Sequence, residues 1–271
     1  MKPETQRIKA KKILGQNFLK NKKILELMAD AAELTKEDSV LEIGPGTGTL
    51  TKVLADRAKK VISVEKDPEL VAWNIKHKTF PENALLIEGD ILKIFNSQFP
   101  ISNQSSNSDF QKYKIVANIP YYITSRFLRL FLSQIKFKPA MMVLMVQYEV
   151  AKRITEKPPH MNLLALSVQT FGKAEFIKKI PKKFFSPQPE VDSAIIKISE
   201  ISDRWFLKNK TDPEKFFEIA RRAFQQKRKM LRRSLKNLPV PEKYKKLRPE
   251  ELSINDWTII LDFSIKESYN I

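Results

Sequence analysis

The sequence contains no cysteine and only two histidines among its 271 residues. Without thiols the chain forms no disulfide bond and offers no thiolate to a metal ion. The two histidines, His77 and His160, do not stand at the spacing of a metal-binding motif, so we expect no metal site. Long apolar runs are also missing. The longest, Ala140–Val146, is far too short to cross a bilayer, and the basic N-terminus lacks the apolar stretch of a signal peptide. We therefore expect a cytoplasmic protein with no membrane partner.

Acidic residues are scarce relative to basic ones. The chain carries 49 Lys and Arg against 31 Asp and Glu, which gives a formal net charge of +18. An excess of this size predicts attraction to polyanions, either nucleic acids or anionic membrane surfaces. Charged residues make up 30% and hydrophobic residues 42% of the sequence, a balance typical of a folded globular chain. This length predicts one large domain with a small second domain.

Short apolar runs alternate with helical patterns through the first two hundred residues. Asp67 is a helix-capping residue followed by proline at the first helical position, so it predicts a helix directly after the second run. Strands separated by helices indicate an α/β fold with a mostly parallel sheet covered by helices on both faces. The predicted strands are Ser39–Ile43, Lys60–Glu65, Ala84–Glu88, Tyr113–Ala117, Ala140–Val146, Ala174–Ile180 and Ser193–Ile198.

The pattern changes beyond about residue 200, and we predict two domains, 1–200 and 201–271. Asp212-Pro213 is a helix-start signal, and apolar residues then recur at helical spacing as far as Leu235, which predicts a small all-helical C-terminal domain. Asn96–Asp109 is rich in serine and asparagine, which predicts a surface insertion.

Glycine is rare, yet three of the six glycines fall within Gly44–Gly48. This loop follows a predicted strand and precedes a helix, which is where a doubly wound fold binds a nucleotide-like ligand. The absence of side chains at Gly44 and Gly46 lets the backbone bend sharply and approach the ligand. The spacing differs from the dinucleotide-binding G-x-G-x-x-G pattern and favours a ligand without a pyrophosphate.

Two acidic residues stand at the ends of the next two predicted strands. Glu65 lies 21 positions after Gly44, where a carboxylate accepts hydrogen bonds from both ribose hydroxyls of a nucleoside. Asp90 follows Gly89 and is placed to accept a hydrogen bond from an adenine amino group. Each residue alone is more often a solvated acid or a turn residue. Together, the glycine loop and the two acids suggest S-adenosylmethionine as cofactor.

The fourth predicted strand ends in Asn118-Ile119-Pro120-Tyr121. The exocyclic N6 of adenine is a poor nucleophile because its lone pair is delocalised into the ring. The Asn118 side-chain oxygen and the Ile119 carbonyl are suitable acceptors for both N6 hydrogens, which would turn the lone pair toward a methyl donor. Pro120 stiffens the turn, and the Tyr121 ring is suited to stack on a flipped base. A plain strand-end turn with a core tyrosine is the competing interpretation.

Basic residues concentrate near the C-terminus. Eight of the sixteen residues from Arg221 to Lys236 are Arg or Lys, and none is acidic. On a continuous helix, Arg222, Lys229, Arg233 and Lys236 share one face, opposite the apolar series. A stripe of one sign favours contact with phosphates over a merely solvated face. The predicted RNA-binding residues are Arg221, Arg222, Arg228, Lys229, Arg232 and Arg233.

Several segments, in this order, resemble the ribosomal RNA adenine dimethyltransferases over about residues 11–236. The ending Val191–Ala194 is more similar to the enzymes that act on the small subunit than to the antibiotic-resistance enzymes that act on large-subunit RNA. Tyr148, where the family commonly has lysine, departs from the pattern. The matching segments are Gly15–Leu19, Leu41–Thr51, Glu65, Gly89-Asp90, Asn118–Tyr121, Phe184–Ala194 and Arg222–Leu231.

The resemblance implies a Rossmann-like, S-adenosylmethionine-dependent methyltransferase domain with a helical C-terminal domain. It implies dimethylation of N6 on two adjacent adenosines in the 3′-terminal hairpin of small-subunit (16S) ribosomal RNA, within the small ribosomal subunit during its biogenesis. We expect the protein to be a monomer. The resemblance also implies that Phe184 stacks on the second face of the target base. The cofactor positions that it implies are Asn17, Leu19, Gly44, Glu65, Asp90 and Asn118, to which the glycine loop adds Gly46.

Two classes of alternative remain open from the sequence. A non-catalytic ribosome-assembly or transcription factor would use the same scaffold, because a fold does not fix a function. A large-subunit rRNA or DNA adenine-N6 methyltransferase would use the same four residues at Asn118–Tyr121.

Overall fold

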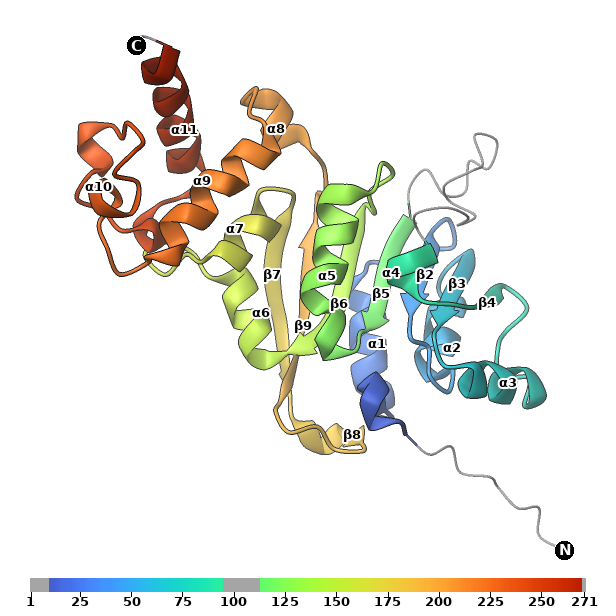
Figure 1. Cartoon of the computed structure of the whole chain (residues 1–271). Helices are drawn as coiled ribbons and strands as arrows, with labels where there is room; N and C mark the ends of the chain where they lie inside the picture. The colour runs from blue at the N-terminus through green and yellow to red at the C-terminus, as the bar shows by residue number, and fades with distance from the viewer. Residues whose placement is uncertain (1–9, 95–112, 270–271) are drawn as a thin grey trace, which may run out of the picture. The chain divides into compact units, whose positions relative to one another are not determined.

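The computed structural model describes residues 10–94 and 113–269 (Figure 1). The predicted insertion Asn96–Asp109 lies outside the described residues. The chain folds into two compact units. The first contains Met1–Tyr148 and Glu175–Ser199, and the second contains Glu149–Ala174 and Glu200–Ile271. Within the described part of the chain, none of the helices has the length and apolar character needed to span a membrane.

The first unit is built on a seven-stranded sheet with the order β4-β3-β2-β5-β6-β9-β7. Strands β4, β3, β2, β5 and β6 run parallel to one another, and β9 runs antiparallel to β6. All seven strands were predicted to within one residue at each end, and the mostly parallel sheet is confirmed. The strands are β2 (Ser39–Ile43), β3 (Lys60–Glu65), β4 (Ala84–Glu88), β5 (Tyr113–Asn118), β6 (Met141–Gln147), β7 (Lys173–Ile180) and β9 (Ser193–Ser199).

Helices cover both faces of this sheet. Alternate strand residues such as Val40, Val61, Val116 and Val143 form one buried cluster with side chains of α1 and α2. Helix α5 lies on the opposite face, in front of β5 and β6 in Figure 1. The helices of this unit are α1 (Lys22–Ala31), α2 (Thr49–Ala55), α3 (Pro68–Lys76), α4 (Ile91–Ile94) and α5 (Thr124–Arg129), with short helical turns η1 (Lys12–Leu14), η3 (Tyr121–Ile123), η4 (Leu130–Gln134) and η5 (Lys182–Phe184).

A second, two-stranded sheet joins segments that lie far apart in the sequence. Strand β1 (Phe18–Leu19) pairs antiparallel with β8 (Phe185–Ser186), so that Leu19 lies opposite Phe185. Both residues are buried in the same apolar cluster as α1 and α2. The motifs around Gly15–Leu19 and Phe184–Ala194 therefore meet in space.

The second unit has its own aromatic core. The ring of Phe171 packs against Phe206 and Phe217, with centroid distances of 5.1 and 6.2 Å. These contacts explain why Glu149–Ala174 groups with the helical unit, although the predicted boundary near residue 200 assigns it to the sheet domain. The helices are α6 (Tyr148–Thr155), α7 (Leu163–Gln169), α8 (Arg204–Lys208), α9 (Pro213–Gln225), α10 (Leu231–Ser234) and α11 (Ile254–Tyr269), with turns η6 (Glu242–Tyr244) and η7 (Pro249–Glu251).

The prediction of one continuous basic helix is wrong. Helix α9 begins after the Asp212 cap, as predicted, but ends at Gln225, and α10 begins only at Leu231. Residues 226–229 are polar and exposed. Since none of them has an apolar side chain to bury, a helix through this segment would gain nothing from packing.

Candidate active site

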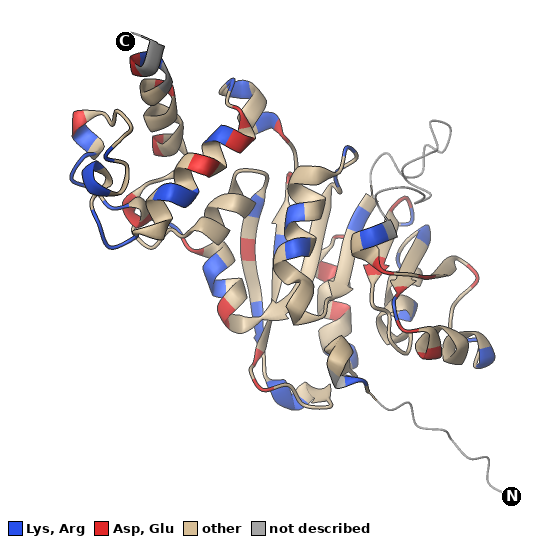
Figure 2. Cartoon of the chain, viewed as in Figure 1, with Lys and Arg blue, Asp and Glu red and all other residues tan. Residues whose placement is uncertain are grey.

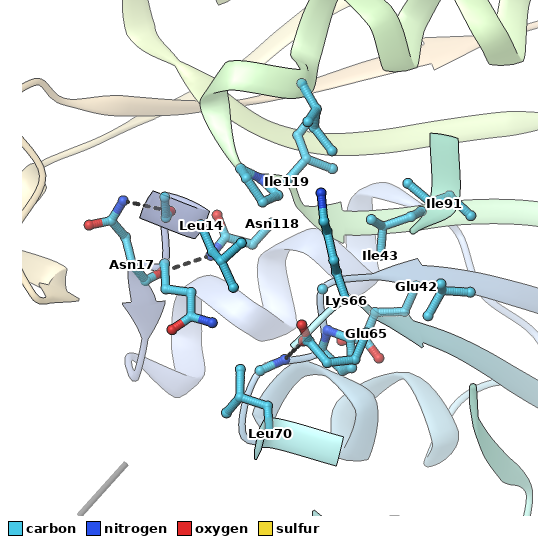
Figure 3. A pocket seen from close by; sticks show the side chains of 18 of the residues that line it. Leu14, Asn17, Glu42, Ile43, Glu65, Lys66, Leu70, Ile91, Asn118 and Ile119 are labelled. Atoms are coloured by element: carbon cyan, nitrogen blue, oxygen red, sulfur yellow. Dashed lines mark hydrogen bonds between the residues drawn. The ribbon is translucent and has the colours of Figure 1, made fainter. Parts of the chain in front are cut away.

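A cleft opens at the carboxyl ends of β2, β3, β4 and β5, with about 1020 Å³ of open space (Figure 3). Parallel strands bring their carboxyl ends to one edge of a sheet, so residues from separate motifs meet here. The cleft brings together nearly all the predicted cofactor and base-binding residues, namely Asn17, Leu19, Gly44, Gly46, Glu65, Asp90 and Asn118–Tyr121.

The glycine loop has a backbone that other residues rarely adopt. Gly44 and Gly46 have φ angles of +65° and +59°. A Cβ atom on Gly46 would lie 3.0 Å from the Phe18 ring, whereas one on Gly44 would meet no atom within 4 Å and would enter open space. The buried side chain of Asn74 donates a hydrogen bond from Nδ2 to the Gly46 carbonyl (2.7 Å) and fixes the loop. The loop therefore presents bare backbone to the cleft.

Glu65 ends β3 and is only 6% exposed. Its Oε1 accepts a hydrogen bond from the Asp67 amide (2.9 Å), and its Oε2 accepts one from the Gly46 amide (3.2 Å). Burial raises the pKa of Glu65, although these amides act in the opposite direction. The amides orient the carboxylate and leave it lone pairs for a ligand, since each oxygen has two acceptor positions.

Asp90 lies one strand away and is held in place by two donors. Its Oδ1 accepts from the Leu92 amide (3.1 Å), and its Oδ2 forms an ion pair with Lys66 Nζ (2.9 Å). Burial raises the pKa of Asp90, but the hydrogen bonds from Lys66 and Leu92 outweigh this effect and the net pKa is lowered. The carboxylate is thus ionised. Lys66 is a cleft residue that was not predicted from the sequence.

Glu42 is a second buried acid of the cleft, and it too was missed. Its Oε2 accepts hydrogen bonds from the hydroxyls of Thr51 and Ser63, both at 2.7 Å. Burial raises the pKa of Glu42 to about 7, despite the two hydroxyls that lower it. The position in the middle of an apolar strand gave no sign that the side chain would face the cleft.

Glu42 is expected to make stability depend on pH. Because the pKa is about 7 in the folded state against 4.5 ordinarily, the folded state binds more protons between these values, and stability falls as the pH rises through them. We expect the free energy of unfolding to fall by about 3 kcal/mol from pH 4.5 to about pH 8, relative to Glu42→Gln, whose amide oxygen still accepts from the hydroxyls. Urea unfolding of both proteins across this range measures the difference. Parallel curves would contradict the assignment.

The Asn118 side chain has a defined orientation. Its Nδ2 donates to the backbone carbonyl of Asn17 (3.1 Å), and Asn17 Nδ2 in turn donates to the Gly15 carbonyl (3.1 Å). Figure 3 shows both asparagines on one side of the cleft. Because Nδ2 is engaged, Oδ1 is the atom left to accept a hydrogen bond from a ligand.

The next residues continue the same site. Among the described residues, none donates a hydrogen bond to the Ile119 carbonyl, so a second acceptor is available beside Asn118 Oδ1. The Tyr121 hydroxyl lies 2.5 Å from Ser193 Oγ on β9, and burial raises the pKa of Tyr121. Ser193 is fully buried and anchors the tyrosine ring at the cleft. This contact of Tyr121 was not predicted from the sequence.

The segment before β1 is fastened to α3 by Asp67. Lys11 Nζ lies 2.7 Å from Asp67 Oδ1, and Gln16 Nε2 donates to Asp67 Oδ2 (2.8 Å). Asp67 also caps α3, and the capping role was the only one predicted. These contacts hold residues 14–17 against the cleft.

Phe184 is the predicted base-binding residue that does not line the cleft. It packs partly buried against the core cluster, and Lys183 Nζ lies 5.6 Å from its ring centroid. It stands directly before β8, whose pairing with β1 brings it near Leu19.

The predicted RNA-binding residues lie in the second unit and all are exposed. Arg221 and Arg222 are on α9, and Arg232 and Arg233 are on α10, while Arg228 and Lys229 lie in the turn between them (Figure 2). The basic residues therefore lie on two helices and the turn between them rather than on one helical face.

The sequence is similar to known rRNA-modifying proteins over most of its length. The family described as "Ribosomal RNA adenine dimethylase" matches residues 7–271. A protein named "Ribosomal RNA small subunit methyltransferase A" from Dehalococcoides mccartyi is 43% identical over 229 residues, covering 84% of this chain and 75% of the relative. A protein of the same name from Clostridium botulinum is 40% identical over 237 residues, covering 86% and 82%.

Two solved structures are similar to this chain over most of its length. A dimethyladenosine transferase from Plasmodium falciparum superposes with a TM-score of 0.74 at 28% identity, covering 92% of this chain and 98% of that structure. The 23S rRNA methyltransferase ErmE superposes with a TM-score of 0.69 at 25% identity, covering 91% and 100%. The predicted fold class is therefore confirmed.

Proposed function

This chain belongs to the ribosomal RNA adenine dimethylase family, and from this premise we propose that it transfers methyl groups from S-adenosylmethionine to N6 of two adjacent adenosines in the 3′-terminal hairpin of small-subunit (16S) rRNA. The product is N6,N6-dimethyladenosine, formed during small-subunit biogenesis. The observation that carries the proposal is that Asn118 lines the same cleft as Glu65 and Asp90, with its Nδ2 held by the Asn17 carbonyl, so that Oδ1 is the atom left to accept from a ligand.

The cleft residues fit S-adenosylmethionine. The open space at Gly44 accommodates a ligand where a side chain would intrude, and the Glu65 carboxylate suits a ribose diol. The ionised Asp90 suits an adenine amino group, and Ile91 and Leu70 offer apolar surface. The bound cofactor supplies an electrophilic methyl group. Asn17, Leu19, Gly46 and Asn118 complete the proposed cofactor set.

The chain's own part in the reaction is to orient the acceptor base. Asn118 Oδ1 and the Ile119 carbonyl accept the two N6 hydrogens, so that the nitrogen lone pair points into the cleft. Tyr121 stacks on the flipped base and Pro120 keeps the turn rigid. We assign the second stacking contact to Phe184. When N6 takes the methyl group, the sulfonium sulfur becomes a neutral thioether and N6 becomes cationic, so its proton is acidic enough to leave to water or a carbonyl and no general base is required. Holding the reactants in line supplies about 7–11 kcal/mol.

Structured RNA of the small ribosomal subunit is the proposed partner of the basic segment 221–236. We further propose that the protein acts in the cytoplasm as a monomer, without a metal. The large-subunit and DNA alternatives are disfavoured because the curated relatives are named for the small subunit. A non-catalytic scaffold is disfavoured because the residues at Glu65, Asp90 and Asn118–Tyr121 are all in the cleft.

Binding to RNA is expected to depend steeply on salt. If the six exposed basic residues neutralise about six phosphates, log affinity falls against log salt with a slope near −4 to −5. The double variant Arg232→Gln/Arg233→Gln is expected to reduce the slope by about 1.5. Lys76→Gln/Lys78→Gln, at the exposed end of α3, removes the same charge and serves as control. Equal slopes for the two double variants would contradict the assigned surface.

Nucleoside mass spectrometry tests the proposed function. Small-subunit particles from cells that lack this modification are incubated with the protein and labelled cofactor, and the RNA is digested. We expect N6,N6-dimethyladenosine in the 3′-terminal fragment. Label confined to large-subunit RNA or DNA would establish the alternative enzymes, and cofactor binding without any transfer would establish the scaffold.

A further inference from the structure

An exposed aromatic ring stands among lysines on the edge strand of the sheet. Phe176 on β7 is 40% exposed, and Tyr148, which follows β6, packs edge-on against it with a centroid distance of 6.0 Å. Lys179 Nζ lies 4.6 Å from the centroid of the Tyr148 ring. We call Phe176, Tyr148 and Lys179 the Phe176 platform. Tyr148 packs against Phe176, and part of the Phe176 side chain stays open to solvent.

The platform is fixed by Asp192. The Asp192 carbonyl accepts from the Tyr148 amide (2.9 Å), and its Oδ2 forms an ion pair with Lys179 Nζ (3.0 Å). Its Oδ1 accepts from the Lys182 amide (2.9 Å). The hydrogen bonds from Lys182 and Lys179 lower the pKa of Asp192, so it stays ionised and holds the lysine in place. Preorganised side chains of this kind lose little entropy when a ligand binds.

The platform lies at the same sheet edge as the Asn118–Tyr121 site. Ser193, which contacts the Tyr121 hydroxyl, is opposite Gln147 in the β6–β9 register, and Tyr148 is the next residue. A continuous series of neighbours thus leads from Tyr121 through Ser193 and Gln147 to Tyr148 and Phe176. An RNA segment that delivers a base to Tyr121 would therefore pass close to the Phe176 platform.

The charge of the surface suits a polyanion. Residues 173–183 contain five lysines and one glutamate, and Figure 2 shows lysines along β7 and in the turn that leads to β8. Four of these lysines are exposed, namely Lys173, Lys178, Lys179 and Lys183. Aromatic rings beside cations are the usual surface for unpaired nucleotides, because every base has a face that stacks.

We propose that the Phe176 platform binds an unpaired nucleotide of the RNA substrate that neighbours the target adenosine, with the base stacked on Phe176 and the backbone phosphate contacted by Lys178 and Lys179. This proposal rests on the proposed function, because it assumes that RNA reaches Tyr121. It gives the protein a second stacking site, outside the cleft.

Steady-state methylation of small-subunit particles tests the platform. We expect Phe176→Ala to raise the KM for RNA about tenfold, the effect of losing one stacked base, with kcat at saturating RNA and cofactor affinity unchanged. Phe176→Leu keeps an apolar side chain at the position and is expected to show the same loss. Phe176→Trp keeps a stacking ring and is expected to restore the KM, which a merely structural role would not require.

Phe137→Ala is the matched control. Phe137 is 45% exposed and has Lys136 Nζ 5.6 Å from its ring centroid. It lies before the N-terminal end of β6, whereas Tyr148 of the platform follows the C-terminal end. The KM of Phe137→Ala for RNA is expected to equal that of the wild type.

A series of RNA substrates identifies the nucleotide that the platform binds. Each substrate has one abasic nucleotide at a different position near the target. At one position, loss of the base should raise the KM of the wild type but not that of Phe176→Ala.

The outcomes separate the two proposals. An unchanged KM in Phe176→Ala and Phe176→Leu, an equal loss in Phe137→Ala, or additive losses at every abasic position would overturn the platform while the proposed function stands. A wild type that transfers no methyl group to adenosine would overturn the proposed function itself.

Discussion

Replacing Asn118 by alanine is expected to lower kcat for methyl transfer about 100- to 1000-fold, with the fold retained. The side chain is partly exposed at the cleft, so its removal leaves no large cavity in the core. What is lost is the amide oxygen, which the hydrogen bond to the Asn17 carbonyl holds toward the cleft. Single-turnover methylation at saturating cofactor and RNA measures the effect, and circular dichroism checks the fold.

Asn83→Ala is a matched control for Asn118→Ala. Asn83 Nδ2 donates to the carbonyls of Ala55 (2.9 Å) and Ala58 (3.3 Å), but the residue precedes β4 and lies at the other edge of the sheet. This variant loses an equivalent side chain and its hydrogen bonds without touching the cleft. It is expected to lose stability and keep kcat. Near-normal turnover of Asn118→Ala would show that the acceptor geometry is misassigned.

Glu65→Ala is expected to weaken cofactor binding by about 100-fold, because two hydrogen bonds to a charged group are lost in a buried site. The loop also loosens, since the Gly46 and Asp67 amides lose their acceptor. Isothermal titration calorimetry with S-adenosylmethionine measures the affinity without RNA.

Glu88→Ala serves as the control for Glu65→Ala. Glu88 lies directly opposite Glu65 in the β3–β4 register, but it is exposed and outside the cleft. Its affinity for the cofactor is expected to equal that of the wild type. If Glu65→Ala binds equally well, the carboxylate does not hold the ribose.

Strands β2, β3, β5 and β6 were predictable because parallel strands buried on both faces are short and mostly apolar. The cleft followed from the same rule, since Gly44, Glu65, Asp90 and Asn118 each stand at the carboxyl end of a predicted strand. Strand order was not needed, because those ends share one edge whatever the order. Local sequence was sufficient for this part of the site.

Other parts depend on tertiary contacts that leave no periodic pattern. Strands β1 and β8 are two residues long, too short for any alternation, so Asn17 and Phe184 were suggested only by the family resemblance. The orientation of Asn118 depends on a carbonyl 101 positions earlier in the chain. The prediction extended the basic helix too far because Phe224 and Leu231, seven positions apart, keep the helical spacing. The residues between them at 226–229 are exposed and bury no apolar side chain.

The pairing of β1 with β8 has a thermodynamic consequence. Asn17 and Leu19, which we propose hold the cofactor, are joined through this small sheet to the segment that carries Phe184, which we propose contacts the RNA. A ligand that restrains one strand restrains the other, so each ligand is expected to raise the affinity for its counterpart by the same factor. With such coupling, binding of the first ligand is expected to order the site of the second, and release of the demethylated cofactor is expected to weaken RNA binding.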